Sequence, residues 1–295
     1  MDDPLTIADA TAVILTGGKS SRMGRPKALL PFDGEPLIAH ILRGLKKMFA
    51  EAVVVAAPEQ ELPTLPALLV RDEVAYQGPV SGIYHGLKAA GHDVCFMTSC
   101  DAPFLNLALI SHLVSQISGC DVVVPFWQDR LQPLHAVYRR GVAPLLKEQL
   151  ERGELRPIFL YDKVRTRKIH EDEIRRHDPE GLSFLNMNSP EEYDAALKLW
   201  SRKNRVSVSV ELFGVARMLA KTQFVPLDLV QGATLAQVFS ALADKFPVLA
   251  GRIISSDGLI SGYTCNINGL DFVRTPSAKV NSGDKIFILS ADAGG

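Results

Sequence analysis

Short, almost continuously apolar runs alternate with amphipathic stretches over the first two hundred residues, and this alternation restricts the fold more than any other feature. Such runs suit strands covered on both faces, as in a mostly parallel sheet. We predict strands at residues 12–15, 52–57, 68–70, 94–97 and 121–125. The predicted helices are 36–49, 81–90 and a last one that begins at the capping signature Ser189-Pro190-Glu191-Glu192 and ends near Trp200. The order predicts an α/β domain over residues 1–200.

The pattern changes after a short, polar and basic segment at residues 201–205, which we predict to be a linker. Residues 206–213 alternate apolar and polar side chains with period two, which is typical of a half-buried strand. Further strands are expected at 224–229, 263–270 and 285–289, with an amphipathic helix at 234–246 that Thr234 caps. The order β-β-α-β-β predicts a second domain over residues 206–295, a ubiquitin-like (β-grasp) α+β roll.

Length and charge exclude several other classes of protein. A chain of 295 residues suits two domains. Its net charge is −1. Residues 206–295 contain seven basic and seven acidic residues, and the preceding residues contain 25 basic and 26 acidic ones. Neither part is basic enough to favour nucleic acid as a partner. No apolar run reaches the roughly 18 residues that a bilayer requires, and the first residues do not resemble a signal sequence. We therefore expect a cytoplasmic protein without nucleic-acid or membrane partners.

A glycine-rich, basic loop directly follows the first predicted strand. Paired glycines let a backbone approach a ligand closely, and nearby cations suit the charge of a triphosphate. The spacing matches neither a Walker A motif nor a dinucleotide fingerprint. Because α/β sheets bind ligands at the carboxyl ends of their strands, we favour a phosphate site over a merely solvated loop. Its candidate residues are Leu15, Thr16, Gly17, Gly18, Lys19, Arg22 and Lys27.

Five segments, in this order, resemble motifs of nucleotidyltransferases of the nucleotide-sugar and molybdopterin type. They are LTGGKSSRMGRPKALL at 15–30, Val70-Arg71-Asp72 with Gly78-Pro79-Val80-Ser81-Gly82, Ser99-Cys100-Asp101-Ala102-Pro103, QPLHAVY at 132–138, and Asn186-Met187-Asn188 with the helix start at Ser189. The likeness covers roughly residues 12–200 and, taken together, is specific to molybdenum-cofactor guanylyltransferases. It implies a Rossmann-like nucleotidyltransferase fold with a mostly parallel sheet.

The resemblance also implies roles for single residues. Asp101 follows a predicted strand, where a hard carboxylate suits Mg²⁺ that carries phosphates. Asp72 would bind the N1 and N2 edge of guanine, and Gly78 and Gly82 would let the base or the pterin approach. Asn186 and Asn188 would meet the pterin or its terminal phosphate. Cys95 and Cys100 are expected to pack near the site rather than react.

The reaction implied is attack by the terminal phosphate of molybdopterin on the α-phosphorus of GTP, with release of pyrophosphate. It needs no covalent nucleophile on the enzyme. Positioning and charge neutralisation by Mg²⁺, Lys19, Arg22 and Lys27 would provide the catalysis.

One position departs from the family pattern. Relatives often carry an asparagine that contacts the nucleotide where this chain has Ala56. The pair Gly17-Gly18 favours the guanine-using branch, since cytidine-using relatives usually have Ala-Gly there. The alternatives are a cytidine- or sugar-specific nucleotidyltransferase, or a non-catalytic scaffold fused to a carrier.

The last residues, Ala293-Gly294-Gly295, follow the last predicted strand. A frayed end is the plain interpretation of two glycines. In a β-β-α-β-β unit, however, residues 206–295 resemble the small subunit of molybdopterin synthase, a ubiquitin-like sulfur carrier. The likeness implies that Gly295 becomes a thiocarboxylate after activation by an adenylating enzyme. It would then donate sulfur within the large subunit of molybdopterin synthase.

Overall fold

The computed structural model describes residues 7–17, 26–72 and 78–290, and the chain forms two compact units, residues 1–194 and 195–295. Residues 201–205, predicted to be a linker, have mostly regular structure. Residues 201–203 form the last turn of α7 (Pro190–Lys203), and β11 already begins at Arg205. The polar composition of this segment is compatible with an exposed helix end, where Arg202 and Lys203 lie favourably near the negative end of the helix dipole.

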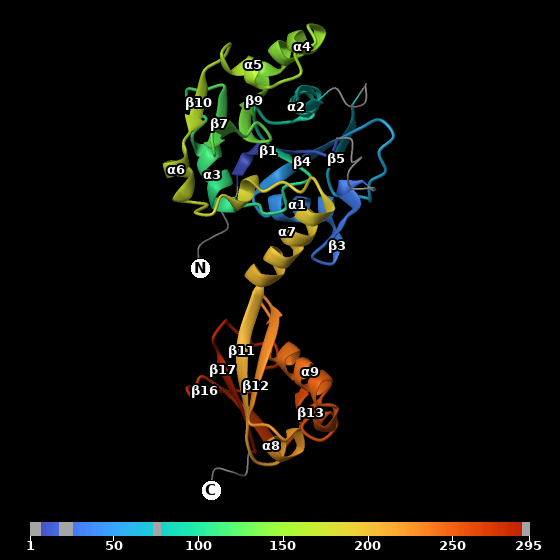
Figure 1. Cartoon of the computed structure of the whole chain (residues 1–295), viewed down its shortest axis with the longest axis vertical. Coiled ribbons are helices and arrows are strands. Elements are labelled where there is room, and N and C mark those ends of the chain that lie inside the picture. The colour runs from blue at the N-terminus through green and yellow to red at the C-terminus, as the bar shows by residue number, and fades with distance from the viewer. Residues whose placement is uncertain (1–6, 18–25, 73–77, 291–295) are drawn as a thin grey trace. The chain divides into compact units, whose positions relative to one another are not determined.

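The larger unit is built on an eight-stranded sheet with the strand order β10-β7-β9-β6-β1-β4-β5, and β8 pairs with β7 (Figure 1). Its strands are β1 (Ile7–Leu15), β4 (Phe49–Ala56), β5 (Leu68–Arg71), β6 (Val94–Ser99), β7 (Val122–Trp127), β8 (Arg130–Leu131), β9 (His135–Arg139) and β10 (Thr166–Ile169). Most neighbours are parallel, which confirms the prediction, whereas β9 runs antiparallel to both β6 and β7. The beginning of β9 therefore lies beside the carboxyl end of β6, where His135 pairs with Thr98.

Helices cover both faces of this sheet, with α2 and α4 on one side and α1 and α3 on the other (Figure 1). The helices are α1 (Leu37–Leu45), α2 (Gly78–Ala89), α3 (Leu107–Ser115), α4 (Ala143–Glu151), α5 (Ile158–Tyr161) and α6 (Glu171–Arg175), and a two-stranded hairpin, β2 (Pro31–Phe32) and β3 (Glu35–Pro36), precedes α1. The helix predicted at 36–49 ends early, because the buried Met48 and Phe49 continue the apolar pattern but belong to a turn and to β4.

Helix α2 packs unusually close to the sheet. Its apolar side chains Val80, Ile83 and Leu87 are wholly buried in a core that β1 and β4 share. A Cβ added at Gly86 would lie 2.5 Å from a methyl group of Val13, so only glycine allows this approach. The position of α2 is therefore fixed by direct contact with the central strand β1.

The smaller unit confirms the predicted order of strands and helix and adds elements to it. Its five-stranded sheet has the order β12-β11-β17-β15-β16, in which β11 and β17 are parallel and the other neighbours antiparallel. Its elements are β11 (Arg205–Leu212), α8 (Gly214–Ala220), β12 (Phe224–Val230), α9 (Leu235–Lys245), β13 (Ile254–Ser255), β14 (Gly258–Leu259), β15 (Tyr263–Ile267), β16 (Asp271–Val273) and β17 (Lys285–Ser290).

One face of this smaller sheet is buried by α9. The inward side chains of β11 and β17, among them Val208, Val210 and Ile286, form a core with Val238 and Leu242 of the helix. Thr234 caps α9 in a reciprocal capping box with Gln237, as the sequence predicts for its first turn. The strand predicted at 263–270 is instead a hairpin, because Asn268 and Gly269 have positive φ angles of 58° and 74° that end β15.

In the ranges that the structure describes, no helix combines the length and the apolar character needed to cross a bilayer.

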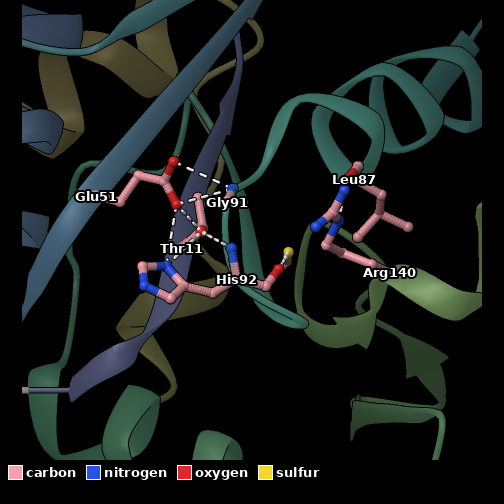
Figure 2. Close-up of polar contacts among 7 residues, drawn as sticks. Thr11, Glu51, Leu87, Gly91, His92 and Arg140 are labelled. Atoms are coloured by element: carbon pink, nitrogen blue, oxygen red, sulfur yellow. Dashed lines mark hydrogen bonds and ion pairs between the residues drawn. The ribbon is translucent and has the colours of Figure 1, made fainter.

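A polar cluster ties β1, β4 and the turn after α2 together (Figure 2). The carboxylate of Glu51 accepts hydrogen bonds from the Thr11 hydroxyl and from the backbone N–H of Gly91, and it contacts Nδ1 of His92 at 3.0 Å. Burial by itself raises the pKa of Glu51. The hydrogen bonds from Thr11 and Gly91, together with His92, outweigh that effect and hold the pKa below its ordinary value of 4.5.

We expect Glu51→Gln to lower the free energy of unfolding by about 1 kcal/mol at neutral pH, because the charged acceptor of these hydrogen bonds is lost. A lowered pKa stabilises the fold above the unfolded value near 4.5, and this contribution disappears as pH falls through the folded pKa. The difference between wild type and variant should therefore shrink in acid.

The measurement is urea unfolding followed by fluorescence in a Trp200→Phe background, in which Trp127 of the larger unit is the only tryptophan. Glu148→Gln, at an exposed helix position, is the matched control and should change little. A difference that stays constant from neutral to acid pH would contradict the role of the Glu51 charge.

Candidate active site

A cavity of about 660 Å³ opens at the carboxyl ends of β1, β4 and β6, which is an ordinary size for a small-molecule site. Parallel strands bring these ends to one edge, and β9 adds its first residue there because it runs in the opposite direction. The walls come from Leu15, Thr16, Gly17, Lys27, Val55, Ala57, Asp72, Gly78, Pro79, Gly82, Ser99, Cys100, Asp101, Ala102, Gln132, Pro133, Leu134, His135, Ser183, Phe184 and Asn186.

The glycine-rich loop is anchored where it leaves β1. The Thr16 hydroxyl donates to the carbonyl of Val55 and lies 3.0 Å from Oε1 of Gln60, and the Gln60 amide donates back to the carbonyl of Thr16. A Cβ at Gly17 would come no closer than 4.0 Å to the next backbone atom, so packing against the described residues does not require glycine there. Gln60 has no motif around it, and the sequence did not reveal this role.

Lys27, Asp101 and Asn188 meet in one hydrogen-bonded network. The Lys27 ammonium is 2.9 Å from Oδ2 of Asp101 and 2.9 Å from Oδ1 of Asn188. Ser99 donates to the other Asp101 oxygen at 2.6 Å. The backbone N–H of Met187 donates to the carbonyl of Asp101 at 2.9 Å, which fastens the Asn186–Asn188 stretch beside the turn after β6. Three distant motifs thus form one charged wall of the cavity.

The Asp101 carboxylate at this wall is a hard oxygen donor, the kind of ligand that Mg²⁺ and similar cations take. Across the described ranges there is no cluster of three or more histidine, cysteine or carboxylate side chains that could hold a metal ion. Mg²⁺ usually takes only one or two protein carboxylates and keeps water or phosphate oxygens as its other ligands. The single carboxylate of Asp101 therefore suits Mg²⁺ brought in with a phosphate ligand.

Asp72 lies across the cavity from this network, at the end of β5. Its backbone N–H donates to the carbonyl of Ala56, and its carboxylate accepts a hydrogen bond from Ser81 of α2. Gly78 begins α2 with a φ of +76°, which favours glycine. A Cβ at Gly82 would crowd the Leu15 side chain at 3.1 Å, so glycine here lets α2 pack closely against the end of β1.

Ala56 is wholly buried, although the resemblance places a nucleotide contact at this position. Successive side chains of a strand point to opposite faces, so the neighbours of Ala56, Val55 and Ala57, form the cavity wall. The departure from the family pattern therefore leaves an apolar wall beside the glycine-rich loop.

His135, Ser183 and Phe184 line the other end of the cavity, and the sequence assigned no role to them. The His135 ring lies edge-on between Phe96 and Phe184, with centroids 5.0 and 5.3 Å away. Neither ring nitrogen of His135 nor the Ser183 hydroxyl has a hydrogen-bond partner among the described residues. Burial lowers the pKa of His135 to about 4, so the ring is neutral and can both donate and accept.

A buried carboxylate shapes this end of the cavity. Asp178 accepts hydrogen bonds from the backbone N–H groups of Leu182 and Ser183, which fixes the short turn that presents Ser183 and Phe184. The segment QPLHAVY at 132–138 was the signal that could have pointed to His135, since it begins at a strand entry. Ser183 lies in no motif.

The structure brings most of the predicted site residues to this one cavity. Its walls include Leu15, Thr16, Gly17, Lys27, Asp72, Gly78, Gly82, Asp101 and Asn186. Asn188 reaches the site through Lys27. Gly18, Lys19, Arg22 and Gly295 lie outside the described residues.

Of the two cysteines expected near the site, one lines the cavity and the other does not. Cys100 lines the cavity, whereas the Cys95 thiol lies away from it and donates to the carbonyl of His92 at 3.6 Å. Burial raises the pKa of each thiol to about 12. Neither is therefore a thiolate at neutral pH.

Comparisons with known proteins agree on the larger unit. Residues 12–166 match the MobA-like NTP transferase domain family. A probable molybdenum cofactor guanylyltransferase of Pelotomaculum thermopropionicum is 36% identical over 61% of this chain and 88% of its own, and the molybdenum cofactor guanylyltransferase of Desulfosudis oleivorans is 35% identical over 63% and 93%. The structure of molybdopterin-guanine dinucleotide biosynthesis protein A from Archaeoglobus fulgidus shares the fold, with a TM-score of 0.58, 24% identity and coverage of 65% of this chain and 99% of that one.

We expect the free energy of unfolding of the larger unit to fall as pH decreases from 6.5 toward 4. In this range His135 is protonated in the unfolded chain but stays neutral in the folded one, where its pKa is about 4. Between about pH 7 and about pH 5 the loss from His135 should reach about 2 kcal/mol. His135→Leu removes this component, so its urea-unfolding free energy should fall less over the same interval. Unfolding is again read from Trp127 fluorescence. Equal losses in wild type and variant would show that His135 is not buried in its neutral form.

Proposed function

Because the chain belongs to the MobA-like NTP transferase family and is therefore a nucleotidyltransferase, we propose that its larger unit transfers GMP from GTP to molybdopterin and releases pyrophosphate. One observation carries the proposal beyond the family. Lys27, Asp101 and Asn188, from motifs far apart in the chain, form one charged network on the wall of the cavity that Gly17 and Asp72 also line.

The nucleotide half of the site would lie over β1, β4 and β5. Backbone N–H groups at the glycine-rich loop and the Lys27 ammonium suit the triphosphate, since cations and amides neutralise charge as it develops at phosphorus. The carboxylate of Asp72 suits guanine, whose N1–H and N2–H groups are both donors. The apolar wall of Val55 and Ala57 offers a surface for the ribose or base.

Asp101 would hold Mg²⁺, with Ser99 orienting the carboxylate through its hydrogen bond. When bound, the metal supplies charge neutralisation and orientation of the phosphates. Lys27 lies 2.9 Å from the same carboxylate, which places one fixed positive charge beside the position where negative charge would accumulate.

Molybdopterin would occupy the half of the cavity that His135, Ser183 and Asn186 line. An oxygen of its terminal phosphate would form a bond to the α-phosphorus of GTP while the bond between the α- and β-phosphates breaks, so that pyrophosphate leaves. The Cys100 thiol is protonated because burial raises its pKa to about 12, which favours this direct transfer over a covalent enzyme intermediate.

We propose further that the smaller unit is a β-grasp sulfur carrier. Its sheet order, with the first and last strands parallel and adjacent at the centre and α9 across one face, supports this assignment. So does its resemblance to the small subunit of molybdopterin synthase. An adenylating enzyme would use ATP to convert the Gly295 carboxylate to an acyl adenylate, with release of pyrophosphate. Sulfide from a donor would then displace AMP, and the thiocarboxylate would deliver sulfur in the large synthase subunit. Both activities would belong to molybdenum-cofactor synthesis in the cytoplasm.

The first test is equilibrium binding of GTP, CTP and ATP, with and without Mg²⁺, to wild type, Asp101→Ala and the control Asp172→Ala, whose carboxylate is exposed on α6. We expect selective binding of GTP that Asp101→Ala weakens by at least about tenfold, and only when Mg²⁺ is present, because the variant loses a metal ligand and not a phosphate-binding cation. The control should behave as wild type.

Other outcomes of this binding experiment would select another function. A preference for CTP would favour the cytidine-using alternative. No nucleotide binding at all would favour the scaffold. If GTP is preferred, turnover with molybdopterin and GTP, read as pyrophosphate release, completes the test.

The carrier proposal has its own test. The full chain is incubated with ATP, sulfide and a sulfur-carrier adenylating enzyme, and intact mass is measured. We expect the mass increase for replacement of one carboxylate oxygen by sulfur in wild type and none in a chain that lacks Gly294 and Gly295. Unchanged mass in wild type, with a known carrier modified in parallel, would refute the carrier role.

A further inference from the structure

Two side chains of α2 hold the carboxylate of Asp72 from behind the cavity wall. The Ser81 hydroxyl donates to Oδ1 at 2.9 Å, and Nε2 of His85 lies 3.4 Å from the same oxygen. Ser81 is 1% and His85 9% exposed, and neither is part of the cavity wall that Asp72 lines. Their position four residues apart places them on one face of the helix, one turn after the other.

These two contacts restrict the last side-chain torsion of Asp72. Rotation of a carboxylate about its last side-chain bond is broad and roughly two-fold, so an unsupported Asp72 could present either oxygen in many directions. The hydrogen bond from Ser81 and the contact of the His85 ring with Oδ1 fix which oxygen faces the helix and thereby the plane of the group. The backbone is fixed as well, because the Asp72 N–H donates to the carbonyl of Ala56.

The donors themselves are on a rigid support. Helix α2 is held against β1 by the close approach at Gly86, and the side chains Val80, Ile83 and Leu87 beside Ser81 and His85 are wholly buried. The Tyr84 ring packs edge-on against the His85 imidazole, with centroids 5.0 Å apart. The direction of the Asp72 carboxylate is thus set by the packing of a helix on the central strand of the sheet.

We infer that Ser81 and His85 are positioning residues that orient the Asp72 carboxylate for recognition of the donor edge of a guanine base. The inference rests on the proposed guanine-binding role of Asp72. A carboxylate in a fixed plane meets N1–H and N2–H together, whereas a rotating one loses the second contact first. The two residues therefore determine discrimination between guanine and a purine without the 2-amino group, and not the affinity for the triphosphate.

The test compares binding of GTP, inosine triphosphate and CTP to the full chain, because inosine triphosphate differs from GTP only by the missing 2-amino group. The variants are Ser81→Ala and His85→Phe, which remove each donor and keep most of its volume, and their combination. Each single change should reduce the ratio of GTP to inosine triphosphate affinity by about three- to tenfold. CTP affinity should stay at its wild-type value.

Two further sets of variants separate positioning from general packing. Ser81→Thr and His85→Gln keep a donor at each position and should retain most of the GTP preference. His92→Asn changes a histidine that also contacts a carboxylate, Glu51, in the polar cluster of Figure 2, and should leave all three affinities unchanged. A structural defect would lower the affinity for every nucleotide together, and circular dichroism on each variant monitors the fold.

The result that overturns the inference is specific. If Asp72→Asn abolishes the preference for GTP while Ser81→Ala and His85→Phe, both folded, leave it intact, then Asp72 reads the base without these two residues. If wild type does not prefer GTP over inosine triphosphate and CTP, and Asp72→Asn changes nothing, the proposed guanine site fails, and the positioning role fails with it. Should the double variant not fold, the single variants decide.

Discussion

The ion pair between Lys27 and Asp101 holds the candidate site together. Lys27 follows the glycine-rich loop, Asp101 follows β6, and Asn188, which accepts from the same ammonium, precedes α7. Each of the two charged side chains is less than one-fifth exposed, so the pair is shielded from solvent more than an ordinary surface ion pair. A charge arranged in this way before a ligand arrives needs little reorganisation when a phosphate binds, which is the condition for electrostatic catalysis.

The sheet makes this arrangement possible because its strands deliver side chains to one edge. Loops after β1, β4 and β6 arrive there in parallel, whereas β9 contributes His135 as it enters the sheet. The side of the cavity where we propose that the nucleotide binds carries the Lys27–Asp101 pair and the glycines Gly17, Gly78 and Gly82. On the opposite side, the neutral His135 ring is buried between two aromatic rings. The Asp178 carboxylate fixes the turn beside it.

The sequence predicted the main strands and several cavity residues because the patterns that reveal them lie within short stretches of the chain. The apolar runs revealed β1, β4 and β6, and the motifs at Asp72 and Asp101 follow strands closely enough to place both residues on the cavity. Contacts made across the fold left no such pattern. Gln60 holds Thr16 from 44 residues away, and the contact between His85 and Asp72 joins α2 to the end of β5. The helical structure of residues 201–203 was not predicted because polar residues extend an exposed helix as readily as they form a linker.

Strand β9 runs antiparallel to β6 and brings residues from a later part of the chain to the cavity. Leu15, Lys27, Asp72 and Asp101 come from the first part of the chain, whereas His135 and Ser183 come from a later part. Asn188 and the backbone N–H of Met187, which contact Lys27 and Asp101, also come from the later part. Substitutions near His135 and Ser183 can therefore change one side of the cavity, whereas changes at 186–188 would also disturb the Lys27–Asp101 pair. In evolutionary terms, one side of the cavity can vary while the charged network is kept.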